Sequence, residues 1–378
     1  MPMRLLDRYF LRELVVPLFY CLTGFLIFWL TFDLFGELGD LQKAELSPGE
    51  IASLYLQKLP ELLVIVIPVA LLLAMLYALT NHSRHNELIA ARAAGIGMWR
   101  LSMVYLTVGT LFSLLLFGVN EGWAARGPGT IEMIQRSKQA GGEGASEGLW
   151  NGPTHIEDRG ANQSWDIENY NLVTTEMIRP RITWNVSDEV TVKMVAEQGV
   201  YTNGVWTFKN LTSFRADPGK PEEEMLQMES YPVLGVKEFL LTPRQVQSEL
   251  RIASLLNNVR LAKEAQVSLS EISDYLTLHP DLPPAKQAKL DTQFHGRLAW
   301  PFTCLVVVLI SIPFGGGSGR RNAYVGVASS IVICFAYFIL MRVGLALGTG
   351  GRLAPWLAAW LPNLLFGGGA GVLIARMR

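Results

Sequence analysis

Residues 59–80 read LPELLVIVIPVALLLAMLYALT. This run has the length of about 20 apolar residues that an α-helix needs to cross the hydrocarbon core of a bilayer. Pro60 and Pro68 fall inside it, and membrane helices tolerate such prolines where neighbouring helices satisfy the carbonyls that proline leaves without a donor. The stretch therefore predicts a membrane-spanning helix.

Five similar stretches lie on either side of it, at about 14–36, 99–120, 298–314, 324–347 and 353–374. The stretch at 298–314 is the shortest, but an amphipathic run that begins at Pro283 and Pro284 leads straight into it. We therefore expect this helix to extend outside the bilayer. The sequence predicts an α-helical membrane protein with six transmembrane helices, three before and three after a long insert.

The composition supports a membrane protein and excludes some partners. Of the 378 residues, 50% are hydrophobic and 17% are charged, a balance that a soluble two-domain protein rarely has. The formal net charge of -1 gives no basic field, and no local basic run replaces it, so we expect no nucleic-acid partner. Cys21, Cys304 and Cys334 fall in apolar stretches, and we interpret them as buried small hydrophobic residues.

The basic residues predict the orientation in the membrane. If the spans alternate, one side holds Arg4, Arg8, Arg12, Arg84, Arg92, Arg100, Arg320, Arg321, Arg376 and Arg378. The opposite short loops hold only Lys43, Lys58 and Arg352. Because cytoplasmic loops carry an excess of Lys and Arg, both termini are predicted in the cytoplasm and the insert outside.

The insert has the pattern of a β-domain. It begins with a stretch rich in Gly, Ser and Glu at 137–148, typical of a flexible linker. Short β-branched or aromatic runs follow at 156–158, 165–168, 172–178, 181–186, 190–196 and 205–211. Asn203 and Gly204 between two such runs indicate a hairpin, because both turn positions need a positive φ. We predict an antiparallel sandwich or jelly-roll.

After the acidic residues 222–224 the pattern returns to helix. Ser268 and Glu271 have the spacing of a capping box. We interpret this part as a helical connector between the β-domain and the membrane, with a partner-docking surface as the alternative.

No enzyme signature is present. The glycine-rich run at 315–321 lacks the Gly-Lys-Ser/Thr ending and the preceding strand of a phosphate-binding loop, so we interpret it as a flexible basic turn. The histidines are scattered and none forms the i, i+4 pair with a glutamate that a zinc protease helix requires. We expect no catalytic residue, metal site or cofactor in this chain.

Residues 86–96, NELIAARAAGI, predict a short Ala-rich helix outside the membrane that ends at Gly95 as its C-cap. Small side chains let another helix or groove approach closely, and Glu87 can pair there with an arginine of a partner. The alternative is a helix lying on lipid, which needs basic residues along one face and bulky apolar residues along the other. This stretch has too little of either, so we predict a docking helix.

The chain resembles the lipopolysaccharide-export permeases of the LptF/LptG type (YjgP/YjgQ) at five motifs in the expected order. They are 6–13 (LDRYFLRE), 86–96 (NELIAARAAGI), Val195-Ala196-Glu197 with Tyr201, Gly204 and Trp206, 294–301 (FHGRLAWP), and 346–348 (ALG) with 355–363 (PWLAAWLPN). They are similar, in turn, to the family's amino-terminal motif, coupling motif, periplasmic jelly-roll repeat, fourth-span start, and last loop with sixth span. Residues 37–43 resemble the LptG-like branch more than the LptF-like one.

The resemblance implies a transport subunit of the inner membrane without its own ATPase site. A paralogous permease would pair with it around a lateral cavity, and a cytoplasmic ABC ATPase dimer, which binds the ATP, would drive both. The jelly-roll would pass lipopolysaccharide to a periplasmic β-jelly-roll bridge protein. The residues implied in ATPase coupling are Glu87, Leu88, Ala91, Arg92, Ala94 and Gly95. The implied organisation is 1–121 with three spans and a coupling helix at about 84–97, 122–292 with linker, jelly-roll and connector, and 293–378 with three spans.

Four charged residues are the candidate substrate or gate residues: Asp33, Lys43, Arg297 and Arg342. Asp33 and Arg342 lie at a similar depth below the outer ends of the first and fifth spans, which flank the lateral opening in the resembled family. We hypothesise that they latch this opening and that an anionic lipid headgroup competes for the guanidinium. The alternative is that Arg342 snorkels to the interface while Asp33 caps the helix end in water.

The sequence departs from the family at two points and leaves two other function classes open. Gly296 stands where the family often has a second basic residue, and the first span lacks the internal lysine or arginine that some members present to lipid phosphates. A mechanotransmitting ABC subunit for lipoprotein release or efflux would usually have four spans. A membrane-anchored periplasmic enzyme would need partners for the acids Glu157, Asp158, Asp166 and Glu168, and none is obvious.

Overall fold

The computed structural model describes residues 5–43, 47–124, 150–171, 174–187, 190–216, 226–257, 267–315 and 323–376. The chain divides into two compact units, a helical unit of residues 1–131 and 284–378 and a β-rich unit of residues 132–283. The predicted linker at 137–148, the acidic residues 222–224 and most of the glycine-rich run at 315–321 lie outside the described residues.

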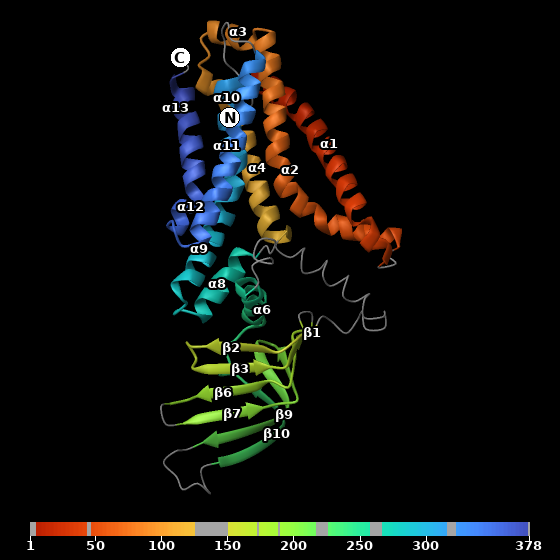
Figure 1. The fold of residues 1–378 in the computed structure, drawn as a ribbon, viewed down its shortest axis with the longest axis vertical. Helices are drawn as coiled ribbons and strands as arrows, with labels where there is room; N and C mark the ends of the chain where they lie inside the picture. Colours follow the sequence, from red (N-terminus) through yellow and green to blue (C-terminus); the bar gives the residue numbers. More distant parts are fainter. Residues whose placement is uncertain are drawn as a thin grey trace. The chain divides into compact units, whose positions relative to one another are not determined.

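The helical unit contains all the long apolar helices (Figure 1). Its elements are α1 (Leu5–Lys43), α2 (Pro48–Arg84), α3 (Glu87–Ala93), α4 (Met98–Val119), η1 (Asn120–Ala124), α9 (Pro284–Ala299), η2 (Trp300–Phe302), α10 (Thr303–Gly315), α11 (Ala323–Thr349), α12 (Pro355–Pro362), η3 (Asn363–Gly367) and α13 (Gly368–Arg376). Within the described residues, six helical segments are long and apolar enough to cross a membrane. The prediction of six spans with a β-domain inserted between the third and fourth is confirmed.

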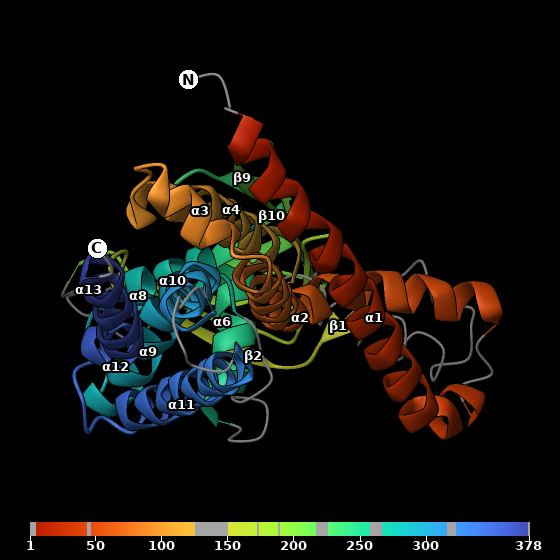
Figure 2. The ribbon, with the colours of Figure 1, turned by 90° about the horizontal axis from the view of Figure 1, so that it is seen from above.

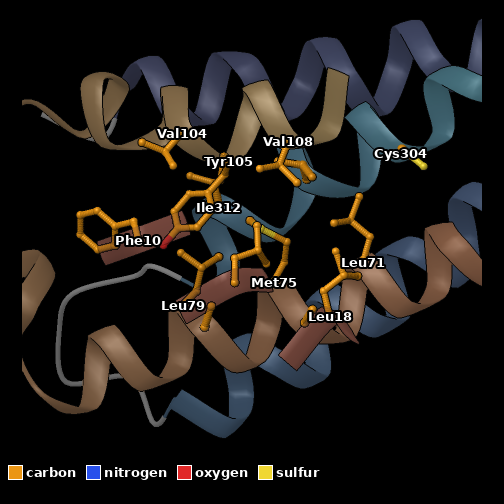
Figure 3. Packing of buried hydrophobic residues seen from close by; sticks show 14 of the residues in the cluster. Phe10, Leu18, Leu71, Met75, Leu79, Val104, Tyr105, Val108, Cys304 and Ile312 are labelled. Carbon is orange, nitrogen blue, oxygen red and sulfur yellow. The ribbon is translucent and has the colours of Figure 1, made fainter. Parts of the chain in front are cut away.

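The core of the helical unit forms where α2, α4 and α10 meet. Leu71, Met75 and Leu79 of α2 pack against Tyr105 and Val108 of α4 (Figure 3). From the far end of the chain, Cys304 and Ile312 join the same core. Segments about 200 to 240 residues apart in sequence therefore bury one another's apolar side chains.

The first helix is only loosely attached to this core. α1 packs mainly along α2, and α1 and α11 lie on either side of α2 (Figures 1 and 2). In the apolar window of α1, 11% of the residues are buried, against 72% in the corresponding window of α2. Most of the surface of α1 is therefore available to lipid or to another protein.

The fourth span is a composite helix, as the amphipathic run before it predicted. α9 begins at Pro284 and continues through the 3-10 turn η2, which contains Pro301, into α10. A buried polar network stabilises the irregular turns: Tyr337 donates a hydrogen bond to Asn363 Oδ1 over 2.7 Å, and Asn363 Nδ2 donates to the carbonyl of Ala299 over 2.9 Å. The side-chain amide thus links the π-helical turn η3 to the start of η2.

Two glycines one helical turn apart allow α11 to approach its neighbours closely. A Cβ atom at Gly344 would lie 2.5 Å from the carbonyl oxygen of Ala358, and one at Gly348 would lie 2.6 Å from Ala358 Cβ and 2.8 Å from the side chain of Thr292. Small residues four apart are typical of close contacts between membrane helices. Gly296 has a similar role, because its Cβ would lie 2.9 Å from Leu345.

Among its described residues, the β-rich unit forms one ten-stranded antiparallel sheet, consistent with the predicted jelly-roll. The strands are β1 (Trp150–Asn151), β2 (Thr154–Asp158), β3 (Gln163–Ile167), β4 (Asn169–Asn171), β5 (Glu176–Ile178), β6 (Arg181–Asn185), β7 (Thr191–Val195), β8 (Gln198–Thr202), β9 (Val205–Ala216) and β10 (Leu226–Val236). Their order is β1-β4-β5-β8-β9-β7-β6-β3-β2, and β10 pairs with β9. β2 therefore lies at one end of this order.

The hairpin at Asn203 and Gly204 is confirmed, with φ values of 53° and 83° and Thr202 paired with Val205. The expectation of helix directly after residues 222–224 was wrong, because β10 occupies 226–236. Pro232 has no N–H to donate, and the ladder between β9 and β10 skips it. Because Pro232 and Gly235 are poor strand formers, residues 226–236 lack the alternating pattern that predicts a strand.

The sheet closes over an aromatic core. Trp165, Trp206 and Phe208 are fully buried, and Phe239 contacts Trp165 at 4.9 Å between ring centroids. The helices α6 (Pro243–Asn257) and α8 (Leu269–Leu278) pack together through Arg251 and Glu271, 2.7 Å apart. The capping box predicted at Ser268 is confirmed at the start of α8.

Candidate functional site

The predicted docking helix is the short helix α3, Glu87–Ala93. Asn86 precedes it with a left-handed φ of 55°, and Gly95 follows it with a φ of 84°. The Gly95 N–H bonds to the carbonyl of Arg92, and the Ile96 N–H to the carbonyl of Ala91. Because Gly95 has no Cβ, it reverses the chain at low cost, as predicted for a C-cap.

The two faces of α3 differ in what they offer to a partner. Leu88 is 2% exposed and belongs to the helical core, and Ala91 packs against the same core. Ala94 and Gly95 are exposed, and Arg92 is half-buried. The sequence reasoning missed Ile89, which is 48% exposed and lies among exposed alanines. The helical spacing of Leu88 and Ala91 was the signal that could have assigned them to the inner face and Ile89 to the outer one.

Glu87 is held by two residues from different helices. The Tyr9 hydroxyl of α1 donates a hydrogen bond to Glu87 Oε1 over 2.8 Å, and His82 Nδ1 of α2 lies 2.6 Å from Oε2. A carboxylate only accepts, so Nδ1 carries the proton in this contact. Burial alone would raise the pKa of Glu87, but the hydrogen bonds from His82 and Tyr9 outweigh it and lower the pKa below its ordinary value.

The first turns of α1 make two further polar contacts close to α3. Arg100 at the start of α4 lies 2.7 Å from Asp7, and Asn81 of α2 donates a hydrogen bond to Glu13 over 3.2 Å. The motif at 6–13 therefore supplies Asp7, Tyr9 and Glu13 to neighbouring helices. These contacts hold this end of α1 to α2, α3 and α4.

At the other end of α1, Asp33 is paired within the hairpin of α1 and α2. Lys58 Nζ donates hydrogen bonds to Asp33 over 3.1 Å and to Glu37 over 2.8 Å, and lies 5.5 Å from the centre of the Tyr55 ring. The sequence reasoning treated Lys58 only as a loop charge. No pattern in the sequence connects it with Asp33, which lies 25 residues away.

The other candidate gate residues lie apart from Asp33. The Arg342 guanidinium lies 5.6 Å from the centre of the Trp300 ring, a cation–π contact. Arg297 is largely buried and donates a hydrogen bond to the carbonyl of Asn120 over 2.6 Å, which stabilises the π-helical end of the third span. Lys43 is the last residue of α1, and its side chain lies outside the described part. The structure does not bring the four together, so the latch of Asp33 and Arg342 stays a prediction.

The described residues contain no metal-binding cluster, since no group of three or more His, Cys, Asp and Glu side chains converges in them. A partly polar cleft of about 310 Å³ lies on β2, β3 and β6, where His155 contacts Asp166 over 2.6 Å. Both side chains of this pair are more than half exposed. Such an exposed pair resembles ordinary surface pairing between strands rather than a catalytic site.

A comparison with known protein families gives one match. The family model described as lipopolysaccharide export system permease LptF/LptG matches residues 8–376. A search of curated proteins found no match. The family match extends over both described units, and it does not separate the LptF and LptG branches.

Proposed function

Because the chain belongs to the LptF/LptG family of lipopolysaccharide export permeases, we propose that it is the permease subunit of an ATP-driven exporter that extracts lipopolysaccharide from the inner membrane. The chain is a multi-pass inner-membrane transport subunit rather than an enzyme. The observation that carries the proposal is the match over 8–376, nearly the whole chain. In this proposal the ATP is hydrolysed by a separate ABC ATPase dimer, and a paralogous permease completes the pathway.

The surface of α3 supports a contact with the ATPase. Ile89 and the exposed alanines form a small apolar face that another protein can approach closely. The Glu87 carboxylate has about four acceptor positions, and Tyr9 and His82 use one on each oxygen. An arginine of the ATPase can therefore bind Glu87 without displacing either residue. The basic flanks of the spans support placing α3 and both termini in the cytoplasm and the β-rich unit in the periplasm.

A strand edge of the β-rich unit supports transfer to a periplasmic bridge. Within the described residues β2 pairs only with β3, so its other edge keeps unpaired backbone groups. β2 contains no proline, whereas β10 contains Pro232, which has no N–H to donate. We therefore place the bridge's sheet along β2, as an added strand.

The first test is purification of the chain from its native host in mild detergent, followed by mass spectrometry of the proteins and lipids that accompany it. We expect an ABC ATPase, a second permease and lipopolysaccharide. A chain that purifies with lipoproteins or a soluble substrate, and without an ATPase, would contradict the proposal.

The second test addresses β2. Photocrosslinking groups at His155 and Glu157, both exposed on β2, should capture a periplasmic β-protein. Lys193 is the matched control, because it is exposed on the central strand β7, which is paired on both sides. Crosslinks only to lipid or to the second permease would exclude the β2 edge as the transfer surface.

A further inference from the structure

The contact between Tyr9 and Glu87 joins two helices that lie far apart in the sequence. Tyr9 is 78 residues from Glu87, whereas His82 is 5 residues away, at the end of the helix that leads into α3. A displacement of α3 reaches α2 through the chain itself. It reaches α1 through the Tyr9 hydroxyl.

The surroundings of His82 fix the position of Glu87. His82 is fully buried, and the ring of Phe10 contacts it edge-on at 4.6 Å between centroids. The Tyr9 ring lies 5.9 Å from the same imidazole. The carboxylate therefore contacts an imidazole that is enclosed by packing, and Tyr9 contacts the same carboxylate from α1.

The attachment of α1 makes it the span most able to respond. Few residues in its apolar window are buried, and beyond its first turns it packs mainly along α2. The polar contacts of Asp7, Tyr9 and Glu13 hold the end of α1 beside α3, and Lys58 holds the other end through Asp33 and Glu37. A helix with few buried residues between two such ends can tilt when one of the ends is displaced.

We infer that Tyr9 and His82 are positioning residues for Glu87 and that the Tyr9–Glu87 hydrogen bond transmits displacement of α3 to α1. The inference rests on the proposed function, because it takes α3 as the helix that an ATPase moves. It also assigns a role to the amino-terminal motif at 6–13, because docking of an ATPase on α3 does not by itself require Tyr9. Tyr9 acts through Glu87 and contacts neither ATP nor the transported lipid.

The test uses the complex purified with its own ATPase and reconstituted into vesicles that contain lipopolysaccharide. The measured quantity is the lipopolysaccharide released per ATP hydrolysed. Tyr9→Phe removes the hydroxyl and keeps the ring, and we expect the ratio to fall about tenfold, as for the loss of one hydrogen bond to a charged group. ATPase binding should stay within error of the unmodified complex, and the melting temperature should fall only slightly, as for the loss of one hydrogen bond. A purely structural role would lower the melting temperature and leave the ratio unchanged.

The matched control is Tyr20→Phe, because Tyr20 lies on the same helix, is 71% exposed and makes no hydrogen bond to a described residue. It should leave the ratio unchanged. His82→Asn keeps a donor near the position of Nδ1 and should restore most of the coupling that His82→Leu loses.

Two results would overturn the inference while leaving the proposed function intact. One is a ratio for Tyr9→Phe equal to that of Tyr20→Phe, and the other is loss of ATPase binding in Tyr9→Phe, which would make the contact part of the docking surface. Absence of any ATPase from the unmodified complex would instead reject the proposed function, and the inference with it.

Discussion

Glu87 receives two hydrogen bonds from inside its own chain and still exposes 30% of its side chain. Its environment therefore combines a rigid support with an open side. Tyr9 and His82 determine where the carboxylate lies, and the open side remains for a partner. Asp33 differs, because Lys58 binds it together with Glu37, and three charged side chains share one contact.

Replacing Glu87 should separate the permease from its ATPase. Truncating one partner of a desolvated charge pair costs on the order of 2–5 kcal/mol, so Glu87→Ala should reduce ATPase affinity by about 30-fold or more. Glu87→Gln keeps the shape and removes the charge, and should lose binding as well. Co-purification and titration of the ATPase measure this. Full binding by Glu87→Ala would show that α3 does not dock through this residue.

The contribution of Glu87 and its hydrogen bonds to the free energy of unfolding should depend on pH in the acidic range. Its pKa is lower in the folded chain than in the unfolded one, so its contribution to stability is complete above the unfolded value and is lost as the pH falls through the folded value. The titratable groups that act on it are His82, His85 and the neutral phenol of Tyr9. Unmodified protein should exceed Glu87→Gln in unfolding free energy by about 1.5 kcal/mol at pH 7. The difference should vanish well below pH ~4.3, the ordinary value for glutamate. A constant difference across this range would contradict the assignment.

At the scale of elements, α11 depends on glycines where other helices carry side chains. The span could be predicted from the sequence but the glycine contacts could not, because the spacing of Gly344 and Gly348 does not identify the helix that they face.

The strands likewise could be predicted only where the signal is local. Asn203-Gly204 predicted its hairpin because the turn chemistry is local, whereas β10 was missed because Pro232 interrupts the strand and its pairing with β9 lies outside the local pattern.

Adding a methyl group to the contact of α11 should destabilise the helical unit. Gly348→Ala places a Cβ within 3 Å of Ala358 and Thr292, so we expect a loss of about 1–3 kcal/mol through overpacking. Gly24→Ala on α1 is the control, because its Cβ would meet open space. Thermal unfolding in detergent should show a lower midpoint for the first variant alone. Equal midpoints would mean that α11 shifts to accommodate the methyl group.

At the scale of the whole molecule, the six spans and the inserted β-domain could be predicted because apolar length and period-2 patterns are properties of single segments. Which residues meet across segments could not. Tyr9 and Glu87, or Asn363 and Ala299, are brought together only by the packing of distant helices. The helix at 87–93 could be predicted from the sequence, whereas its inner face and the two residues that contact Glu87 could not, and its docking role stays a prediction.

The predicted latch of Asp33 and Arg342 concerns the whole assembly. α1 and α11 lie on either side of α2, so a contact between the two residues requires α1 to move or two subunits to meet (Figure 2). A cysteine pair at these positions should form a disulfide in the reconstituted complex, and lipopolysaccharide loading should suppress it. Failure to crosslink in every nucleotide state would leave Asp33 with Lys58 and Arg342 with Trp300.

The membrane core is built from both ends of the chain, with residues 132–283 between them. A ribosome adding 5–20 residues per second needs roughly 10–30 s to make that insert. During this time the core between α2 and α4 lacks Cys304, Val308 and Ile312, which pack into it once α10 has been made. The first three spans are therefore in the membrane before the residues that complete their core have been made. The stability of residues 1–131 depends on packing against residues 284–378.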